Sequence, residues 1–129
     1  MIRITLVYAL GLTAFLLMVD FGGLHAVARY VNQLPVMDKL IHFCMFGLLA
    51  LLANASLVRR PRWRMVGAIA TGSILVLIAS TIEECSNLFV ACRSWSLADL
   101  AANYLGVVCL GILPMVAWQW KQSESSKTD

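Results

Sequence analysis

Charged residues are scarce in this chain. Only 13% of its residues are charged and 60% are hydrophobic, with a mean hydropathy of +0.80. Soluble domains carry about 25% charged residues. A chain of 129 residues has the size of one domain, too small to hide this much apolar surface in a soluble core. The composition therefore excludes an ordinary soluble domain and predicts an integral membrane protein.

Common catalytic and metal-binding motifs are also missing. The sequence has no HExxH, CxxC or GxSxG motif and no glycine-rich phosphate loop. No serine lies in a nucleophile motif, and the chain has no room for a nucleotide-binding domain. The sequence therefore favours a binding protein over an enzyme, and it indicates no cofactor and no resident metal.

Long apolar stretches are what the chain has instead. A membrane-spanning helix needs roughly 17–25 predominantly apolar residues, and four stretches approach or meet this length. We expect an all-α membrane protein, a compact bundle of four transmembrane helices at about 4–21, 38–58, 65–84 and 98–119. These form one domain, 1–121, followed by a disordered polar tail, 122–129. A cleaved signal peptide is the alternative for the first segment, because Ala26-Val27-Ala28 resembles a small-residue cleavage site.

Lysine and arginine are distributed unevenly over the loops. With four spans, seven lie on the side of the termini: Arg3, Arg59, Arg60, Arg62, Arg64, Lys121 and Lys127. Three lie on the other side: Arg29, Lys39 and Arg93. The positive-inside rule then predicts cytoplasmic N- and C-termini. The basic loop at 59–64 is too tight to read nucleic acid, so topology and contact with anionic lipid are the favoured explanation.

Acidic residues gather at the opposite, outer margin. Five of the seven are expected there: Asp20, Asp38, Glu83, Glu84 and Asp99. Helical spacing puts further polar residues on the same faces. The pairs are Asp38 with His42, Glu84 with Asn87, and Asp99 with Asn103. Because ionisable groups near lipid usually face the bundle interior or a water-filled cavity, we expect an outward-facing polar pocket, capped by Arg93.

Each of these residues also has a structural interpretation. Asp38 and Asp99 stand where a carboxylate caps a helix N-terminus. His42 is expected to bond Glu84 or Asp99 and lock two helices together, to contact a substrate, or to hold a cation with two carboxylates. Arg93 either pairs with a carboxylate or clamps a phosphate. The residues alone leave these alternatives open.

Small and special residues suggest how the helices pack. Ala68 and Gly72, four residues apart, permit close approach of the third helix, and Gly106 and Gly111 do the same for the fourth. Pro114 is expected to kink the inner end of the fourth helix. A disulfide between Cys85 and Cys92 requires the third helix to end near residue 87, because one continuous helix would hold these residues about 10 Å apart.

The ordered pieces DKLIHFCMFGLLALL, EECSNLF, an arginine, an aspartate and AANYLGVVCLG resemble the VanZ-like family of small bacterial membrane proteins, named after one linked to teicoplanin resistance. Its pattern is Asp-Lys-x-x-His-Phe, Glu-x-x-Gln, Arg and Asp-x-x-x-Asn-x-x-Gly. The matching residues are Asp38, Lys39, His42, Phe43, Glu84, Arg93, Asp99, Asn103 and Gly106. Asn87 replaces the family glutamine, and Ala91-Cys92 replaces the Pro-Gly that often precedes the arginine.

The resemblance implies a multi-pass protein of the bacterial inner membrane, part of the cell envelope, whose polar site faces the outside. It also implies an effect on glycopeptide-type antibiotic susceptibility. We therefore expect the pocket to bind a polar headgroup, such as that of a lipid-linked cell-wall precursor, with membrane lipids as its other contacts. The expected ligand-binding residues are Asp38, Lys39, His42, Glu84, Asn87, Arg93, Asp99 and Asn103. The alternatives are a membrane-surface enzyme with Glu84, Asp99 and His42 as its acid–base or metal site, and an assembly protein whose polar cluster only joins helices.

Overall fold

The computed structural model describes residues 1–21, 34–60, 64–89 and 95–128. These residues form helices, and no strand occurs among them. The helices are α1 (Ile2–Phe21), α3 (Pro35–Val58), α4 (Met65–Ser86), α5 (Leu97–Gly106) and α6 (Leu113–Thr128). A 3₁₀ turn, η1 (Asn87–Phe89), follows α4, and a π-helical stretch, η2 (Val107–Ile112), joins α5 to α6.

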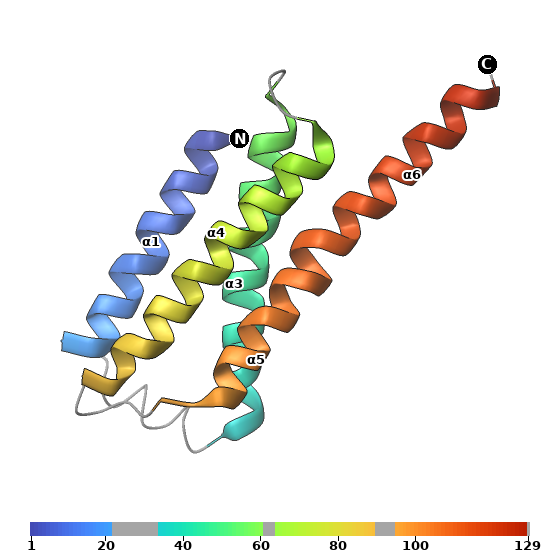
Figure 1. Cartoon of the computed structure of the whole chain (residues 1–129). Helices are drawn as coiled ribbons and strands as arrows, with labels where there is room; N and C mark the ends of the chain where they lie inside the picture. The colour runs from blue at the N-terminus through green and yellow to red at the C-terminus, as the bar shows by residue number, and fades with distance from the viewer. Residues whose placement is uncertain (22–33, 61–63, 90–94, 129) are drawn as a thin grey trace.

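Four helical segments are long and apolar enough to cross a membrane: Ile2–Val19, Val36–Val58, Met65–Phe89 and Leu97–Lys121. The prediction of an all-helical protein with four helices able to span a membrane is therefore confirmed for the described residues. The N-terminus and the C-terminus lie at the same end of the structure (Figure 1). The assignment of that end to the cytoplasm stays a prediction.

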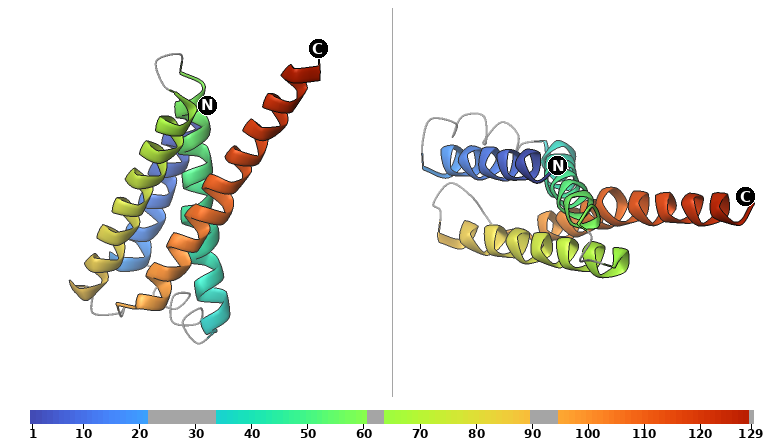
Figure 2. Two further views of the ribbon diagram at one scale, coloured as in Figure 1. Left: turned by 45° about the vertical axis from the view of Figure 1, so that its right-hand side comes forward. Right: turned by 90° about the horizontal axis from the view of Figure 1, so that it is seen from above.

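Helix α3 occupies the centre of the bundle. It packs against α1, α4, α5 and η2, while α1 packs chiefly against α3 alone. Seen from above, α1 and α4 flank α3 on opposite sides, and α6 extends away from the others (Figure 2). Because α3 and α5 are neighbours, the polar residues at the start of each helix come together at one end of the bundle.

Glycines set the close approach of α3 to its neighbours. A Cβ on Gly106 would lie 2.1 Å from the carbonyl oxygen of Phe43, and one on Gly111 would lie 2.6 Å from the Cβ of Ala50. Both glycines therefore pack as predicted. A Cβ on Gly47 would in turn lie 2.7 Å from the carbonyl oxygen of Gly106, so glycines meet across the α3–α5 contact. Such contacts between small residues are a common basis of helix association in membranes.

Helices α5, η2 and α6 form one continuous helix from Leu97 to Thr128. In its π stretch the Leu113 N–H bonds the carbonyl of Val108, five residues earlier. Pro114 follows immediately, and proline has no N–H to give to the preceding turn. The irregularity predicted at Pro114 therefore takes the form of a π segment before it, a common way for a helix to accommodate a local break in its hydrogen bonding.

The helix ends differ from the sequence predictions in two places. Helix α3 begins at Pro35 rather than at residue 38, because proline at the first helical position sacrifices no hydrogen bond. The sequence predicts a disordered tail at 122–129, whereas α6 continues to Thr128. No proline or glycine follows Pro114, so nothing in this tail breaks the helix.

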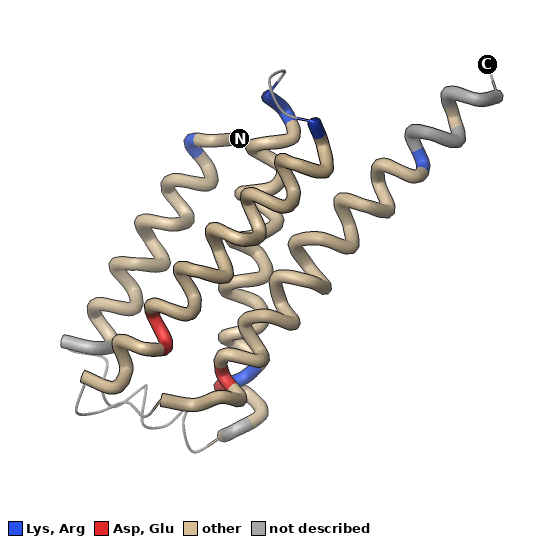
Figure 3. Tube along the Cα trace, in the orientation of Figure 1, with Lys and Arg blue, Asp and Glu red and all other residues tan. Residues whose placement is uncertain are grey.

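Charge is segregated between the two ends of the bundle. Lysine and arginine lie mainly at the end that carries both termini, and the acidic residues coloured red lie at the opposite end (Figure 3). Of the described lysines and arginines, only Lys39 lies at this opposite end, which we call the polar end. The distribution inferred from the loops thus recurs in the three-dimensional arrangement.

Candidate functional site

An ion-paired triad joins α3 to α5 at the polar end. Lys39 Nζ contacts Asp38 Oδ2 at 3.1 Å and also pairs with Asp99 Oδ1. The side chains are 35%, 17% and 10% exposed for Lys39, Asp38 and Asp99, so the ammonium group is the most accessible of the three. The lysine therefore neutralises part of the charge of two carboxylates from different helices while remaining within reach of the outside.

Asp38 does not cap α3 as the sequence predicted. The residue at the cap position is Leu34, and no side chain bonds the free N–H groups there. Because α3 begins at Pro35, Asp38 lies within the first turn, where its charge still suits the helix dipole. Its carboxylate is therefore available to Lys39.

Asp99 is likewise not the cap of its helix. Ser96 caps α5, with its Oγ accepting a hydrogen bond from the Asp99 N–H at 3.3 Å. In a capping box the acidic residue would return a bond to the Ser96 N–H. Glu84 of α4 makes that bond instead, with Oε1 2.7 Å from the Ser96 nitrogen. The Asp99 carboxylate is thereby free to pair with Lys39.

His42 bonds an amide rather than the carboxylates proposed from the sequence. Its Nδ1 lies 3.2 Å from Asn103 Oδ1, and both residues are buried. Because an amide oxygen only accepts hydrogen bonds, Nδ1 carries the proton. The other ring nitrogen, Nε2, then presents a lone pair in the neutral ring. Among the described residues, His42 makes no other hydrogen bond.

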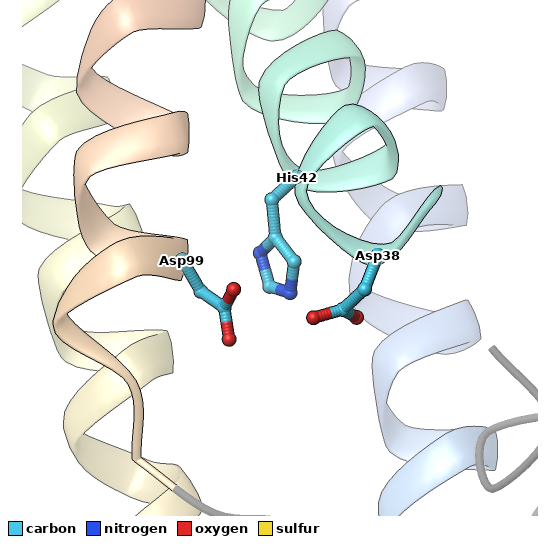
Figure 4. Close-up of side chains that lie close together, drawn as sticks. All are labelled: Asp38, His42 and Asp99. Atoms are coloured by element: carbon cyan, nitrogen blue, oxygen red, sulfur yellow. The ribbon is translucent and has the colours of Figure 1, made fainter. Parts of the chain in front are cut away.

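The carboxylates of Asp38 and Asp99 flank the His42 ring (Figure 4). One potential ligand atom from each of these three residues lies within 4.8 Å of the others. A second group, formed by His42, Glu83 and Glu84, meets the same limit. His42 therefore stands between carboxylates from α3, α4 and α5.

Two amide groups at the polar end have atoms without a partner. Asn87 Nδ2 donates to Glu84 Oε2 at 3.3 Å, but Asn87 Oδ1 is buried and unpaired. Asn103 Oδ1 accepts from His42, but Asn103 Nδ2 is buried and unpaired. Asn87 is 2% exposed and Asn103 is 0% exposed. An unpaired buried polar group costs about 1–3 kcal/mol, so each of these atoms needs an explanation.

A second buried polar site lies in the middle of the bundle. Asn54 Nδ2 donates to Ser73 Oγ at 3.0 Å and to the Gly111 carbonyl at 2.9 Å. Its Oδ1 has no hydrogen-bond partner and lies 2.2 Å from the place of a Cβ on Gly72. We call Asn54, Ser73, Gly111 and Gly72 the mid-bundle node. It joins α3, α4 and η2 without any charged group.

The structure brings together seven of the eight predicted ligand-binding residues at the polar end. These are Asp38, Lys39, His42, Glu84, Asn87, Asp99 and Asn103. The eighth, Arg93, lies outside the described residues, as does Cys92. Cys85, the proposed partner of Cys92, is an exposed free cysteine.

Sequence reasoning missed the role of Ser96. Its backbone N–H donates a hydrogen bond to Glu84 Oε1, and its hydroxyl oxygen caps α5 by accepting from the Asp99 N–H. The Ser-x-x-Asp spacing at 96–99 is a recognised signature of a helix start and could have identified this residue.

Comparisons of this chain with protein families, with curated proteins and with solved structures found no match.

Proposed function

We propose that the polar end binds the headgroup of a lipid-linked molecule, of the cell-wall precursor class, and that the chain acts in the bacterial envelope as the VanZ-like resemblance implies. The supporting observation is the convergence of charged and amide side chains from α3, α4 and α5 at one accessible end. Orientation adds support, because the positive-inside rule turns this end away from the cytoplasm.

The unpaired amide atoms match such a headgroup. Asn103 Nδ2 is a free donor and Asn87 Oδ1 is a free acceptor. Sugar hydroxyls and peptide amides supply both an acceptor and a donor, so a headgroup that enters between the helices can satisfy both asparagines. Their side chains are 0% and 2% exposed and would have to open toward it. Lys39 already pairs with two carboxylates, so we assign recognition to the sugar and peptide groups of the headgroup rather than to its phosphate.

Binding is tested directly with the purified full chain in lipid nanodiscs. The probe is a polyprenyl-diphosphate-linked disaccharide peptide, and the comparison ligand is polyprenyl phosphate, which lacks the sugar and peptide. We expect the precursor to bind at least tenfold more tightly than polyprenyl phosphate. Asn103→Ala should reduce that affinity about tenfold, because it removes the free donor. Equal binding of the two ligands, or no binding, contradicts the proposal.

Asn54→Ala is the matched control variant. It removes an equally buried asparagine from the mid-bundle node, distant in the chain from the residues of the polar end. We expect it to lower the melting temperature in detergent without changing precursor affinity. In cells, Asn103→Ala should abolish any effect of the chain on glycopeptide susceptibility, while Asn54→Ala should retain it wherever expression is equal.

A purely structural cluster is the competing function, favoured by the bonds that join helices. Glu84 binds the start of α5 through the Ser96 N–H, and Lys39 links α3 to Asp99. If the cluster only joins helices, each variant at the polar end should weaken the effect on antibiotic susceptibility in proportion to the drop in its melting temperature. The two functions are thus separated by measuring stability and susceptibility on the same set of variants.

A further inference from the structure

We propose that Asp38, His42 and Asp99 form a binding site for a divalent cation of the Mn²⁺, Fe²⁺ or Zn²⁺ class, and that the Lys39 ammonium occupies the position of that cation when it is absent. The proposal goes beyond headgroup recognition. It rests on how lone pairs, charge and access are arranged around His42.

The first argument concerns the histidine. The hydrogen bond to Asn103 Oδ1 uses Nδ1 as its donor, so Nε2 is the ring nitrogen left to bind an ion, on a side chain only 6% exposed. The ring lies between two carboxylates, which are themselves acceptors (Figure 4). Three acceptors that converge in this way need a positive species between them. A hydrogen bond from one ring nitrogen to a neighbouring oxygen is also how proteins orient metal-binding histidines.

The second argument concerns charge. Lys39 pairs with both Asp38 and Asp99, so one positive charge faces two negative charges. A divalent cation would neutralise both carboxylates. The lysine side chain is 35% exposed, so it can swing outward and leave a path for the ion. Exchange of the ammonium for the metal ion therefore removes the residual charge from a largely buried site.

The third argument concerns the type of ion. Carboxylates suit Mg²⁺, Ca²⁺ and Mn²⁺, whereas imidazole suits Zn²⁺, Fe²⁺ and related ions. A set of one imidazole and two carboxylates therefore fits ions that accept both nitrogen and oxygen. Bound ligand atoms would approach one another to about 3 Å, given bond lengths of about 2.1 Å. The present separations, within 4.8 Å, close to that value through side-chain rotation at the ends of α3 and α5.

The alternative group of His42, Glu83 and Glu84 is less suited to an ion. The two oxygens of Glu84 already accept hydrogen bonds, from the Ser96 N–H and from Asn87 Nδ2. Metal binding there would compete with the contact that joins α4 to the start of α5. At the first group, the ion displaces only the ammonium of a partly exposed lysine.

The site is tested by titrating purified full-length protein in detergent with Mn²⁺ and following the free ion by electron paramagnetic resonance. We expect one saturable Mn²⁺ per chain. Asp99→Asn and His42→Ala should each weaken binding at least tenfold. Wild-type protein that binds no Mn²⁺ saturably, or ligand variants that bind it as well as wild type, would overturn the proposal. No lipid precursor is present, so the result is separate from the test of headgroup binding.

Lys39→Gln is the most informative variant, because misfolding cannot imitate its expected effect. Removal of the competing ammonium should tighten Mn²⁺ binding at least fivefold. Lys121→Gln removes the same charge at the other end of the structure and should leave the affinity unchanged. Unchanged or weaker binding by Lys39→Gln would show that lysine and metal do not share a position. Zn²⁺, followed by calorimetry, should give the same order of affinities among the variants.

Discussion

The mid-bundle node and the polar end are two buried polar sites that differ in charge and in exposure to the outside. Both contain fully buried asparagines, and both have a buried amide atom without a hydrogen-bond partner. In the node, Asn54 Oδ1 lies against Gly72, where even a methyl group would not fit. At the polar end, the unpaired amides accompany charged groups and a partly exposed lysine. An unpaired atom alone therefore does not mark a binding site, and the proposal of one at the polar end depends on the charged groups and the partly exposed lysine beside the amides.

The two sites also differ in how they join helices. The node uses one neutral side chain that donates to α4 and to η2. The polar end uses ion pairs and a carboxylate that accepts a backbone N–H. Hydrogen bonds between membrane helices contribute on average about 0.6 kcal/mol, up to about 1.7 kcal/mol. The node joins three helical segments without burying a charge, while the polar end holds more charge than helix packing requires.

The largest effect is expected for Gly106→Ala, which should disrupt the close α3–α5 contact next to the polar end. The new Cβ would meet the Phe43 backbone carbonyl, which a side-chain rotation cannot move away. Helices α3 and α5 must then separate, and we expect a loss of about 3 kcal/mol in the free energy of unfolding. Chemical denaturation in detergent measures it.

Gly11→Ala is the control for this substitution. No heavy atom lies within 4 Å of its Cβ position, so the added methyl group meets open space. We expect stability to stay equal or to rise by up to about 1 kcal/mol through helix propensity. A Gly106→Ala protein as stable as Gly11→Ala would show that the close α3–α5 contact is not needed.

The next largest effect is expected for Asn54→Ala, which tests whether the node and the polar end are independent. It removes both hydrogen bonds of the node, and we expect a loss of about 1–2 kcal/mol in the free energy of unfolding. Mn²⁺ affinity and headgroup affinity should remain at their wild-type values. A parallel loss of either affinity would mean that the node and the polar end act as one unit.

Glu84→Gln tests how far charge matters at the polar end. The glutamine oxygen still accepts the Ser96 N–H, so the contact of α4 with α5 persists. We expect the free energy of unfolding to change by less than about 1 kcal/mol, since the Ser96 bond persists and a neutral amide costs less to bury than a carboxylate. The melting temperature and antibiotic susceptibility of the same variant are the measurements. Equal loss of both would favour the structural interpretation.

The smallest effect is expected for Tyr104→Phe. The Tyr104 hydroxyl lies 2.9 Å from Thr81 Oγ1, in a pair that links α4 to α5 on the exposed surface of the bundle. Thr81 Oγ1 also donates to the Leu77 carbonyl and keeps a partner without the tyrosine. We expect a change below about 0.5 kcal/mol in thermal unfolding. A loss larger than that of Asn54→Ala would indicate that the surface of the α4–α5 contact contributes more than the mid-bundle node.

Much of this architecture was predictable from particular residues. Long apolar segments predicted four spanning helices, and the lysine and arginine distribution predicted the segregation of charge that Figure 3 displays. Helical spacing paired Asp99 with Asn103 on one face, and both are buried. The packing roles of Gly72, Gly106 and Gly111 also follow from the small size that lets helix backbones approach.

Other features could not be predicted because they depend on which helices meet. Glu84 takes the backbone N–H that the capping-box pattern assigns to Asp99, and this releases Asp99 toward Lys39. His42 finds an amide partner instead of a carboxylate. Spacing along one helix reveals a shared face, but it does not reveal the register between two helices, which sets every one of these contacts.

The sequence by itself determined that this chain forms helices able to cross a membrane, how many there are, and at which end most of its acidic residues gather. Apolar length and charge distribution suffice for these features, since the bilayer demands them of any such chain. Only the tertiary structure decided that α3 lies at the centre and that Lys39 stands between two aspartates beside His42. Close packing through glycines fixes that register, because a shift of α3 along α5 would bring side chains into the places that Gly47 and Gly106 leave open.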